Sequence, residues 1–120
     1  MRRTVLIVDD EESIRAAIQA GLETIGDFEV THAHNGHTAL KRLESTRPDI
    51  LFVDLVLPDI DGLQLLRAVK SKPLRLRPRR IVLMTAHPDP IPADRIGEFG
   101  AHALLEKPFQ LQGLADVIAG

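Results

Sequence analysis

Apolar residues along the chain form short unbroken runs separated by longer amphipathic stretches. Three runs of four apolar residues lie at 5–8, 50–53 and 81–84, and a shorter run lies at 103–105. Such short continuous runs are typical of strands buried on both faces of a parallel sheet. Residues 28–31 instead alternate apolar and polar side chains, which indicates a strand near an edge of the sheet. The pattern therefore predicts five strands.

The stretches between these runs carry apolar residues at helical spacing. The apolar stripes are Ile14, Ala17, Ile18, Gly21, Leu22 and Ile25, then Ala39, Leu40 and Leu43, then Gly62, Leu65, Leu66 and Val69, and finally Leu111, Leu114, Ala115 and Ile118. Asn35 and Asp61 stand where they can cap the second and third of these helices. Prolines at 88, 90 and 92 exclude an interior helix there, so a further helix is expected only from about Pro92 to Gly100.

Strands alternating with helices in this way predict an α/β fold. We expect a doubly wound domain with a five-stranded parallel sheet, five helices on both of its faces and right-handed crossovers. The 120 residues are enough for one compact domain spanning 1–120, and no repeat, low-complexity segment or linker divides it.

Composition narrows the possible functions. A net charge of -2 lacks the basic excess of a general nucleic-acid binder. The chain has no cysteine, which excludes disulfides and thiolate metal sites. It has no Trp or Tyr and only four Phe, which argues against aromatic stacking on bases or sugars. Because no stretch fits a signal-peptide core or a membrane span, a soluble cytoplasmic domain is expected.

Polar residues that could carry chemistry follow four of the predicted strands. Asp9 and Asp10 follow the first strand, Asp54 ends the central one, Thr85 ends the fourth, and Lys107 lies just past the last. In open α/β sheets ligands bind at the carboxyl ends of the strands, so these side chains should share a cleft. Three carboxylates there would repel one another, and Mg²⁺ suits them because it also leaves positions for phosphate oxygens. A hydroxyl and an ammonium would complete a phosphoryl cradle, with Asp54 as nucleophile.

With these features, the chain resembles the receiver domain of bacterial two-component response regulators over essentially its whole length. The matching segments are 5–11, 52–55, Leu57-Pro58, Asp61-Gly62, 84–86 and 107–109. No segment is specific alone, but all of them in this order on five βα units are a strong signal. The resemblance implies a flavodoxin-like fold with strand order 2-1-3-4-5.

The resemblance also implies a role for each site residue. The metal site would consist of Asp9, Asp10, Asp54 and the backbone carbonyl of Val56. Asp10 would bind Mg²⁺ directly and Asp9 mainly through water. Asp54 would be the phosphoacceptor, with Thr85 and Lys107 as the hydroxyl and the cation that contact the phosphate. The Lys107-Pro108 bond is a candidate cis peptide, on the resemblance alone.

Three positions are expected to modulate the site. Members of the family often carry Tyr or Phe three residues before the lysine, whereas this chain has Leu104, which puts aromatic-gated switching in doubt. Val56 and His87, two residues past Asp54 and Thr85, should flank the phosphoryl group. By resemblance, residues at these two positions tune hydrolysis of the acyl phosphate: Val56 would shield it, and His87 would either orient the attacking water or pack over the site.

Two further clusters are open to a functional or a structural interpretation. His32, His34 and His37 lie close together in the sequence, but surface residues around a turn are expected rather than a metal site, because no carboxylate joins them locally. A basic connector carries Lys70, Lys72, Arg75, Arg77, Arg79 and Arg80. A solvated loop is the favoured interpretation of this connector, and a partner-docking patch is the alternative.

The leading functional hypothesis is a phosphorylation-dependent signalling switch in a two-component system or phosphorelay. The domain would take a phosphoryl group from a partner histidine kinase or phosphotransfer protein onto Asp54 and change its partner-binding surface. It would catalyse only its own phosphorylation and dephosphorylation. Expected partners include an output domain or partner protein, with no direct contact to nucleic acid or membrane. A homodimer on phosphorylation remains an option, and the chain could be a stand-alone receiver or part of a longer regulator.

Other functions fit less well. A Mg²⁺-dependent phosphohydrolase of the haloacid dehalogenase type also uses an Asp nucleophile, but that family places two acids around one residue after its first strand, whereas Asp9 and Asp10 are adjacent. A degenerate receiver acting only as a binding module is disfavoured by the intact set of acids, threonine and lysine. A flavodoxin would need a hydroxyl- and glycine-rich phosphate loop after the first strand.

Overall fold

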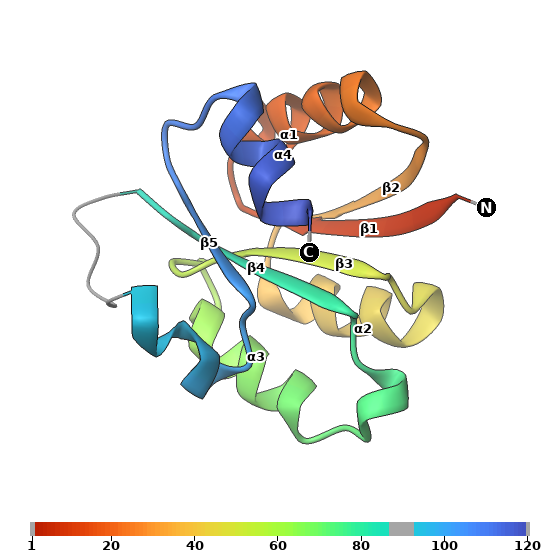
Figure 1. The fold of residues 1–120 in the computed structure, drawn as a ribbon. Coiled ribbons are helices and arrows are strands. Elements are labelled where there is room, and N and C mark those ends of the chain that lie inside the picture. The colour runs from red at the N-terminus through yellow and green to blue at the C-terminus, as the bar shows by residue number, and fades with distance from the viewer. Residues whose placement is uncertain (1, 87–92, 120) are drawn as a thin grey trace.

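The computed structural model describes residues 2–86 and 93–119. Its centre is a five-stranded parallel sheet in the order β2-β1-β3-β4-β5 (Figure 1). The strands are β1 (Arg3–Val8), β2 (Phe28–Ala33), β3 (Ile50–Asp54), β4 (Arg80–Thr85) and β5 (Ala103–Glu106). This confirms the five expected strands, the strand order implied by the resemblance and the α/β fold class. The alternating segment 28–31 belongs to β2, an edge strand, as its pattern predicted.

Helices cover both faces of the sheet (Figure 1). Helices α1 (Glu12–Ile25) and α4 (Leu111–Ile118) lie on one face, and α2 (Gly36–Thr46), α3 (Gly62–Lys70) and the 3₁₀ helix η2 (Ala93–Phe99) lie on the other. A further 3₁₀ turn, η1 (Leu74–Leu76), lies in the connector between α3 and β4. None of the helices in the described ranges is long and apolar enough to cross a membrane.

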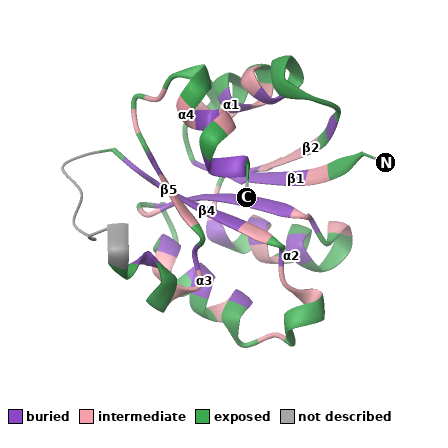
Figure 2. Ribbon diagram, viewed as in Figure 1, coloured by how far each residue is buried: buried purple, intermediate pink, exposed green. Residues whose placement is uncertain are grey.

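Alternate residues of the strands point into two separate hydrophobic clusters, one on each face, because side chains of a strand alternate in direction. On β1, Val5 and Ile7 join the cluster beneath α1 and α4. Leu6 and Val8 join the cluster beneath α2, α3 and η2. The strands of the centre are therefore buried on both sides, as Figure 2 shows for β1, β3 and β4. This double burial explains why these strands are continuous apolar runs in the sequence.

The predicted caps are formed. Asn35 accepts a hydrogen bond from the Thr38 amide at the start of α2, 2.8 Å long. Asp61 and Gln64 form a reciprocal capping box at the start of α3, with bonds of 2.8 and 3.0 Å between each side chain and the other residue's amide. The predicted α3 stripe is confirmed as well, since Gly62 and its three apolar partners are all buried.

The structure corrects two details of the predicted helices. The segment expected as a fifth α-helix is the 3₁₀ helix η2, so the described residues contain four α-helices. The 3₁₀ form has three residues per turn, which places Ile96 and Phe99 on the same side, toward the sheet. The stripe of α4 is also shifted: Leu111 is 48% exposed, and Val117 is buried instead.

Candidate functional site

The register of the parallel strands brings the predicted polar residues to one edge of the sheet. Asp54 pairs with Met84 across β3 and β4, and Thr85 pairs with Glu106 across β4 and β5. Val8, the last residue of β1, pairs with Val53. Asp9, Asp54, Thr85 and Lys107 consequently follow or end neighbouring strands at the same edge, as the sequence predicted.

Three carboxylates meet there. One oxygen from each of Asp9, Asp10 and Asp54 lies within 4.8 Å of the others. Asp9 is fully buried and Asp54 is 6% exposed, whereas Asp10 lies at the surface. Backbone amides fix two of the groups: Glu11 donates to Asp9 Oδ1 at 2.9 Å, and Val56 donates to Asp54 Oδ1 at 3.1 Å. Each of the two buried carboxylates is thus held through its Oδ1, which leaves its Oδ2 for a positively charged partner.

Lys107 supplies part of the positive charge that these acids need. Its Nζ donates to Asp9 Oδ2 at 2.6 Å and to Asp54 Oδ2 at 2.9 Å, and its side chain is only 9% exposed. Burial disfavours the ammonium form, but the hydrogen bonds and negative charges of Asp9 and Asp54 outweigh burial and raise the pKa of Lys107. The lysine is therefore charged at neutral pH and bridges the two buried acids. Its peptide bond to Pro108 is cis, as the resemblance implied.

Thr85 and the lysine are coupled through the backbone. The Lys107 amide donates to the Thr85 carbonyl at 2.8 Å, which continues the β4–β5 pairing to the edge of the sheet. Thr85 is 3% exposed and lines the same cavity as Asp54 and Lys107. A hydroxyl, an ammonium and a carboxylate therefore face one space.

This space is an open cavity of about 800 Å³ at the carboxyl edge of the sheet. Its polar lining includes Asp10, Asp54, Asp61, Thr85 and Lys107. The remainder is largely contributed by the loop that follows Asp54, residues 55–58. The cavity is wide enough to admit a phosphoryl group together with part of the molecule that donates it.

Gly62 holds that loop against β3. Its amide donates to the Leu55 carbonyl at 2.8 Å, and a Cβ added at this position would lie 2.3 Å from the carbonyl oxygen of Asp54. Real Cβ atoms do not approach a backbone oxygen so closely, so only glycine fits here without a shift of the backbone. The sequence placed Gly62 on the apolar stripe of α3 but did not reveal its contact with Asp54.

Asp59 ties the far end of the loop to helix α2. Its carboxylate accepts hydrogen bonds from the amides of Gly36 at 2.8 Å and His37 at 2.9 Å, and it also contacts the His37 ring. Burial acts to raise the pKa of Asp59, but the backbone bonds from Gly36, His37 and Ile60, with the His37 ring, lower it well below its usual range. The loop after Asp54 is therefore anchored at both ends.

The three acids offer a donor set that fits Mg²⁺. The donor set consists of oxygens alone, which suits a hard cation, and two of the three carboxylates already have one oxygen occupied by a backbone amide. Among the residues that the structure describes, these three acids form the one group of His, Asp or Glu side chains close enough to share an ion.

The residues predicted to modulate the site differ in burial and in whether they line the cavity. Val56 is 76% exposed and lines the same cavity as Asp54. Leu104 is partly buried and packs against the core cluster beneath α2 and α3. His87 lies outside the described residues.

The histidines do not form a cluster in space. His32 bonds to Gln19, His34 bonds to its neighbour Asn35, and His37 bonds to Asp59. The preference for surface residues over a metal site therefore agrees with their separate partners. The pKa of His32 is lowered by burial and by the charges of two arginines.

Arg15 was missed by the sequence reasoning. It follows the acidic start of α1, and its Nη1 donates to the backbone carbonyl of Asp9 at 2.7 Å. Its Nε is buried without a hydrogen-bond partner. The available signal was a single basic residue one turn into a helix that starts with acidic residues. Only the fold shows that its side chain reaches back to Asp9, directly after β1.

Comparisons with known proteins agree with this geometry. The sequence model of the response regulator receiver domain matches residues 5–119. The alkaline phosphatase synthesis transcriptional regulatory protein PhoP of Bacillus subtilis is 34% identical over 109 residues, which cover 91% of this chain and 44% of that protein. Response regulator Rre1 of Synechocystis is 33% identical over 117 residues, 96% of this chain and 49% of that protein. The chain thus spans less than half the length of these curated relatives.

A solved structure matches over nearly its whole length. The chemotaxis response regulator CheY4 of Vibrio cholerae superposes with a TM-score of 0.85 at 28% identity, covering 98% of this chain and 97% of that one. The fold and the sequence match indicate the same family. The chain therefore belongs to the response regulator receiver domain family, whose members are phospho-aspartate signalling switches and not dedicated enzymes.

Proposed function

We propose that Asp54 is the phosphoacceptor of this receiver. The observation that carries the proposal is the bridge made by Lys107, whose Nζ lies 2.9 Å from Asp54 Oδ2 and 2.6 Å from Asp9 Oδ2. Asp54 is the acid that closes the central strand and also lines the cavity, with Thr85 on the adjacent strand. A phosphoryl group that enters the cavity would therefore contact the Asp54 carboxylate, with the Thr85 hydroxyl and the Lys107 ammonium nearby.

The transfer forms one bond and breaks another. A carboxylate oxygen of Asp54 attacks the phosphorus of a phosphohistidine on the donor, and the P–N bond to that histidine breaks as the P–O bond forms. The imidazole leaves with the electron pair of the broken bond, and Asp54 becomes an acyl phosphate. Dephosphorylation follows when water attacks the same phosphorus and returns the carboxylate and inorganic phosphate.

The surrounding residues would stabilise the charge on the transferred group. Asp9, Asp10 and Asp54, with the backbone carbonyl of Val56, would hold Mg²⁺, which would neutralise phosphoryl oxygens during transfer. Lys107 would exchange its bond to Asp54 for one to a phosphate oxygen, and Thr85 would donate its hydroxyl to another. We propose Val56, His87 and Leu104 as modulators of the phosphoryl lifetime and of the switch.

Membership of the family implies a histidine kinase as partner. We further propose that a phosphotransfer protein can act as donor, that an output domain or a separate protein receives the signal, and that phosphorylation can favour a homodimer. Phosphorylation would act by shifting the population between two surface conformations.

We also propose that residues 1–120 form one domain, because a single sheet contributes to both core clusters.

Phosphorylation by a small donor tests the assignment directly. We expect acetyl phosphate with Mg²⁺ to add one phosphoryl group to the parent protein, measured as intact mass, and to add none to Asp54→Asn. Asp61→Asn is the matched control, because Asp61 lines the same cavity and asparagine can still cap α3. Undiminished labelling of Asp54→Asn, or loss of labelling in the Asp61 variant alone, would refute the proposal.

A further inference from the structure

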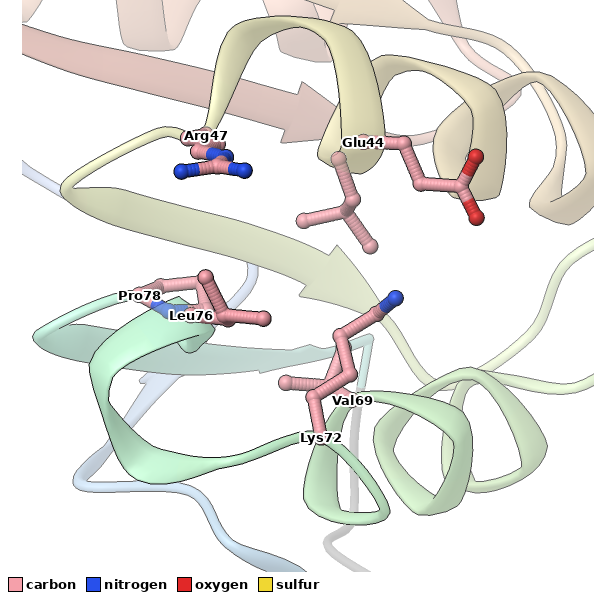
Figure 3. A pocket seen from close by; sticks show the side chains of 7 residues that line it. Glu44, Arg47, Val69, Lys72, Leu76 and Pro78 are labelled. Atoms are coloured by element: carbon pink, nitrogen blue, oxygen red, sulfur yellow. The ribbon is translucent and has the colours of Figure 1, made fainter.

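A second, smaller pocket opens at the opposite edge of the sheet, where the strands begin. It lies between the carboxyl ends of α2 and α3 and has a volume of about 250 Å³ (Figure 3). Its apolar lining is formed by Leu43, Val69, Leu76 and Pro78. Three of these four residues are buried, so the pocket reaches into the edge of the core.

Charged side chains stand at its rim. Arg47, after α2, and Lys72, after α3, lie on opposite sides of the pocket, and Glu44 is the third charged residue of the lining (Figure 3). Within residues 2–86 and 93–119, neither the Arg47 guanidinium nor the Lys72 ammonium has a salt bridge or a side-chain hydrogen bond. Both cations are available to a ligand.

The backbone of Arg47 adopts an unfavourable conformation to occupy this place. Its φ of 43° lies in the left-handed region, where a helix usually ends in glycine or asparagine. A residue with a side chain pays a conformational cost there, and no ion pair among the described residues compensates it. Arg47 therefore places a guanidinium at the pocket although its backbone conformation favours glycine.

The positive surface continues along the connector that follows α3. Arg75 and Arg79 are exposed, and Leu74 between them and Lys72 is 77% exposed. The chain as a whole carries a net charge of -2, so this basic and apolar edge is a local feature, opposite the acidic edge at Asp54.

We propose that this pocket binds an acidic peptide segment of a partner protein, with one aliphatic side chain of the peptide inserted between α2 and α3. Carboxylates on either side of the inserted residue pair with Arg47 and Lys72. The volume suits one side chain and falls below the ~300–1,000 Å³ usual for small-molecule sites.

A polynucleotide is the less suitable occupant. The pocket has no aromatic side chain on which a base could stack, whereas its apolar lining suits an aliphatic side chain. Because the pocket and Asp54 lie at opposite edges of the sheet, peptide binding does not require phosphorylation. Its test is therefore separate from that of the phosphoacceptor.

Chemical-shift titration of the ¹⁵N-labelled protein at low salt tests the proposal. The probe is the capped peptide Gly-Asp-Glu-Leu-Glu-Asp-Gly, compared with one twin in which serine replaces leucine and another in which amides replace the carboxylates. We expect the amide signals of Val69 and Leu76 to move with the first peptide and to respond much less to either twin. The signals around Asp54 should stay in place, and Asp54→Asn should bind the peptide as the parent does.

Variants locate the site. Lys72→Glu should weaken binding about fivefold, because an exposed attraction is replaced by a repulsion. Arg47→Gly should weaken it about twofold to threefold while retaining the melting temperature of the parent, because glycine suits this backbone. Arg42→Glu is the matched control on the same helix: Arg42 is exposed and does not line the pocket, so binding should be unchanged.

Several results would overturn the proposal. One is equal binding of the leucine and serine peptides, which would show that the pocket receives no side chain. Another is equal loss of affinity in the Arg42 and Lys72 variants, which would indicate attraction to overall charge. A third is competition by a single-stranded oligonucleotide at the same concentration as the peptide, which would identify a general polyanion surface. No shift at Val69 and Leu76 with any of the peptides would also refute it.

Discussion

Gly62→Ala tests whether close contact between α3 and the phosphoacceptor strand determines both stability and activity. The added Cβ would lie 2.3 Å from the Asp54 carbonyl oxygen and 2.9 Å from Leu55 Cα. Both are backbone atoms, so no side chain can rotate to relieve the contact. Either α3 must move away from β3, or the loop after Asp54 must shift. The 2.8 Å hydrogen bond from the Gly62 amide to Leu55 would lengthen in either case.

Two effects of opposite sign determine the size of the change. Alanine in place of glycine gains up to ~1 kcal/mol of helix propensity. Overpacking costs ~1–3 kcal/mol, and contact with rigid backbone places this case at the upper end of that range. The net result should be a loss of about 2 kcal/mol in the free energy of unfolding. For a domain of this size that corresponds to a melting temperature about 8 °C lower.

Urea denaturation and the rate of labelling by acetyl phosphate measure the two consequences. We expect Gly62→Ala to lose stability and also to label more slowly, because the displaced carbonyl belongs to Asp54 itself. Gly113→Ala in α4 is the matched control, since its nearest contact would be Leu105 Cδ1 at 3.9 Å. That variant should be more stable by ~0.5–1 kcal/mol and should label at the rate of the parent.

Two results for Gly62→Ala would contradict the expected role of this contact. If Gly62→Ala is as stable as the parent, or gains stability as the control does, the backbone near residue 62 moves at little cost and the contact does not fix the loop after Asp54. If stability falls but the labelling rate is unchanged, the contact supports the fold without positioning Asp54.

Three further predictions concern metal, pH and signal lifetime. Mg²⁺ should raise the melting temperature of the parent protein by binding the folded state. Asp10→Ala should remove this response without lowering stability in the absence of metal. If saturating Mg²⁺ leaves the melting temperature of the parent unchanged, the metal site is contradicted. Burial, with the charge of Arg80, lowers the pKa of His102, whose Nδ1 accepts the Ile81 amide at 2.9 Å. The unfolded chain therefore takes up this proton first, so the contribution of His102 to the free energy of unfolding should be present above about pH 6.5 and fall below it. Urea titrations at pH 7.5 and 5.5 should show a smaller pH effect in His102→Ala, and an identical pH effect would argue against it. Finally, phospho-Asp54 should live longer in His87→Ala by a factor of ~10² or less, with a changed profile across roughly pH 5.5 to 8; equal lifetimes would leave no role for His87.

The hydrophobic pattern of the sequence alone predicted the alternating strands and helices of an α/β fold, because that information is local and periodic, whereas the strand order came from the resemblance. Unbroken apolar runs required strands buried on both faces, and β1, β3 and β4 are such strands. The caps at Asn35 and Asp61 were also predictable, because a cap depends on residues three positions apart. The acids, Thr85 and Lys107 could be placed at one edge because the carboxyl ends of parallel strands meet there.

Only the tertiary structure decided how distant segments meet. The bridge from Lys107 to Asp9 and Asp54, the contact of Gly62 with Asp54 and the bond from Asp59 to α2 each join residues whose spacing carries no periodic signal. Segment 93–99 was misjudged as an α-helix because its turns are too few for periodicity to separate a repeat of 3.0 residues from one of 3.6. Leu111 was misjudged because a stripe at the start of a helix is buried only if the neighbouring element covers it. The pocket between α2 and α3 depends on the distance between two helix ends, which packing of the whole core sets.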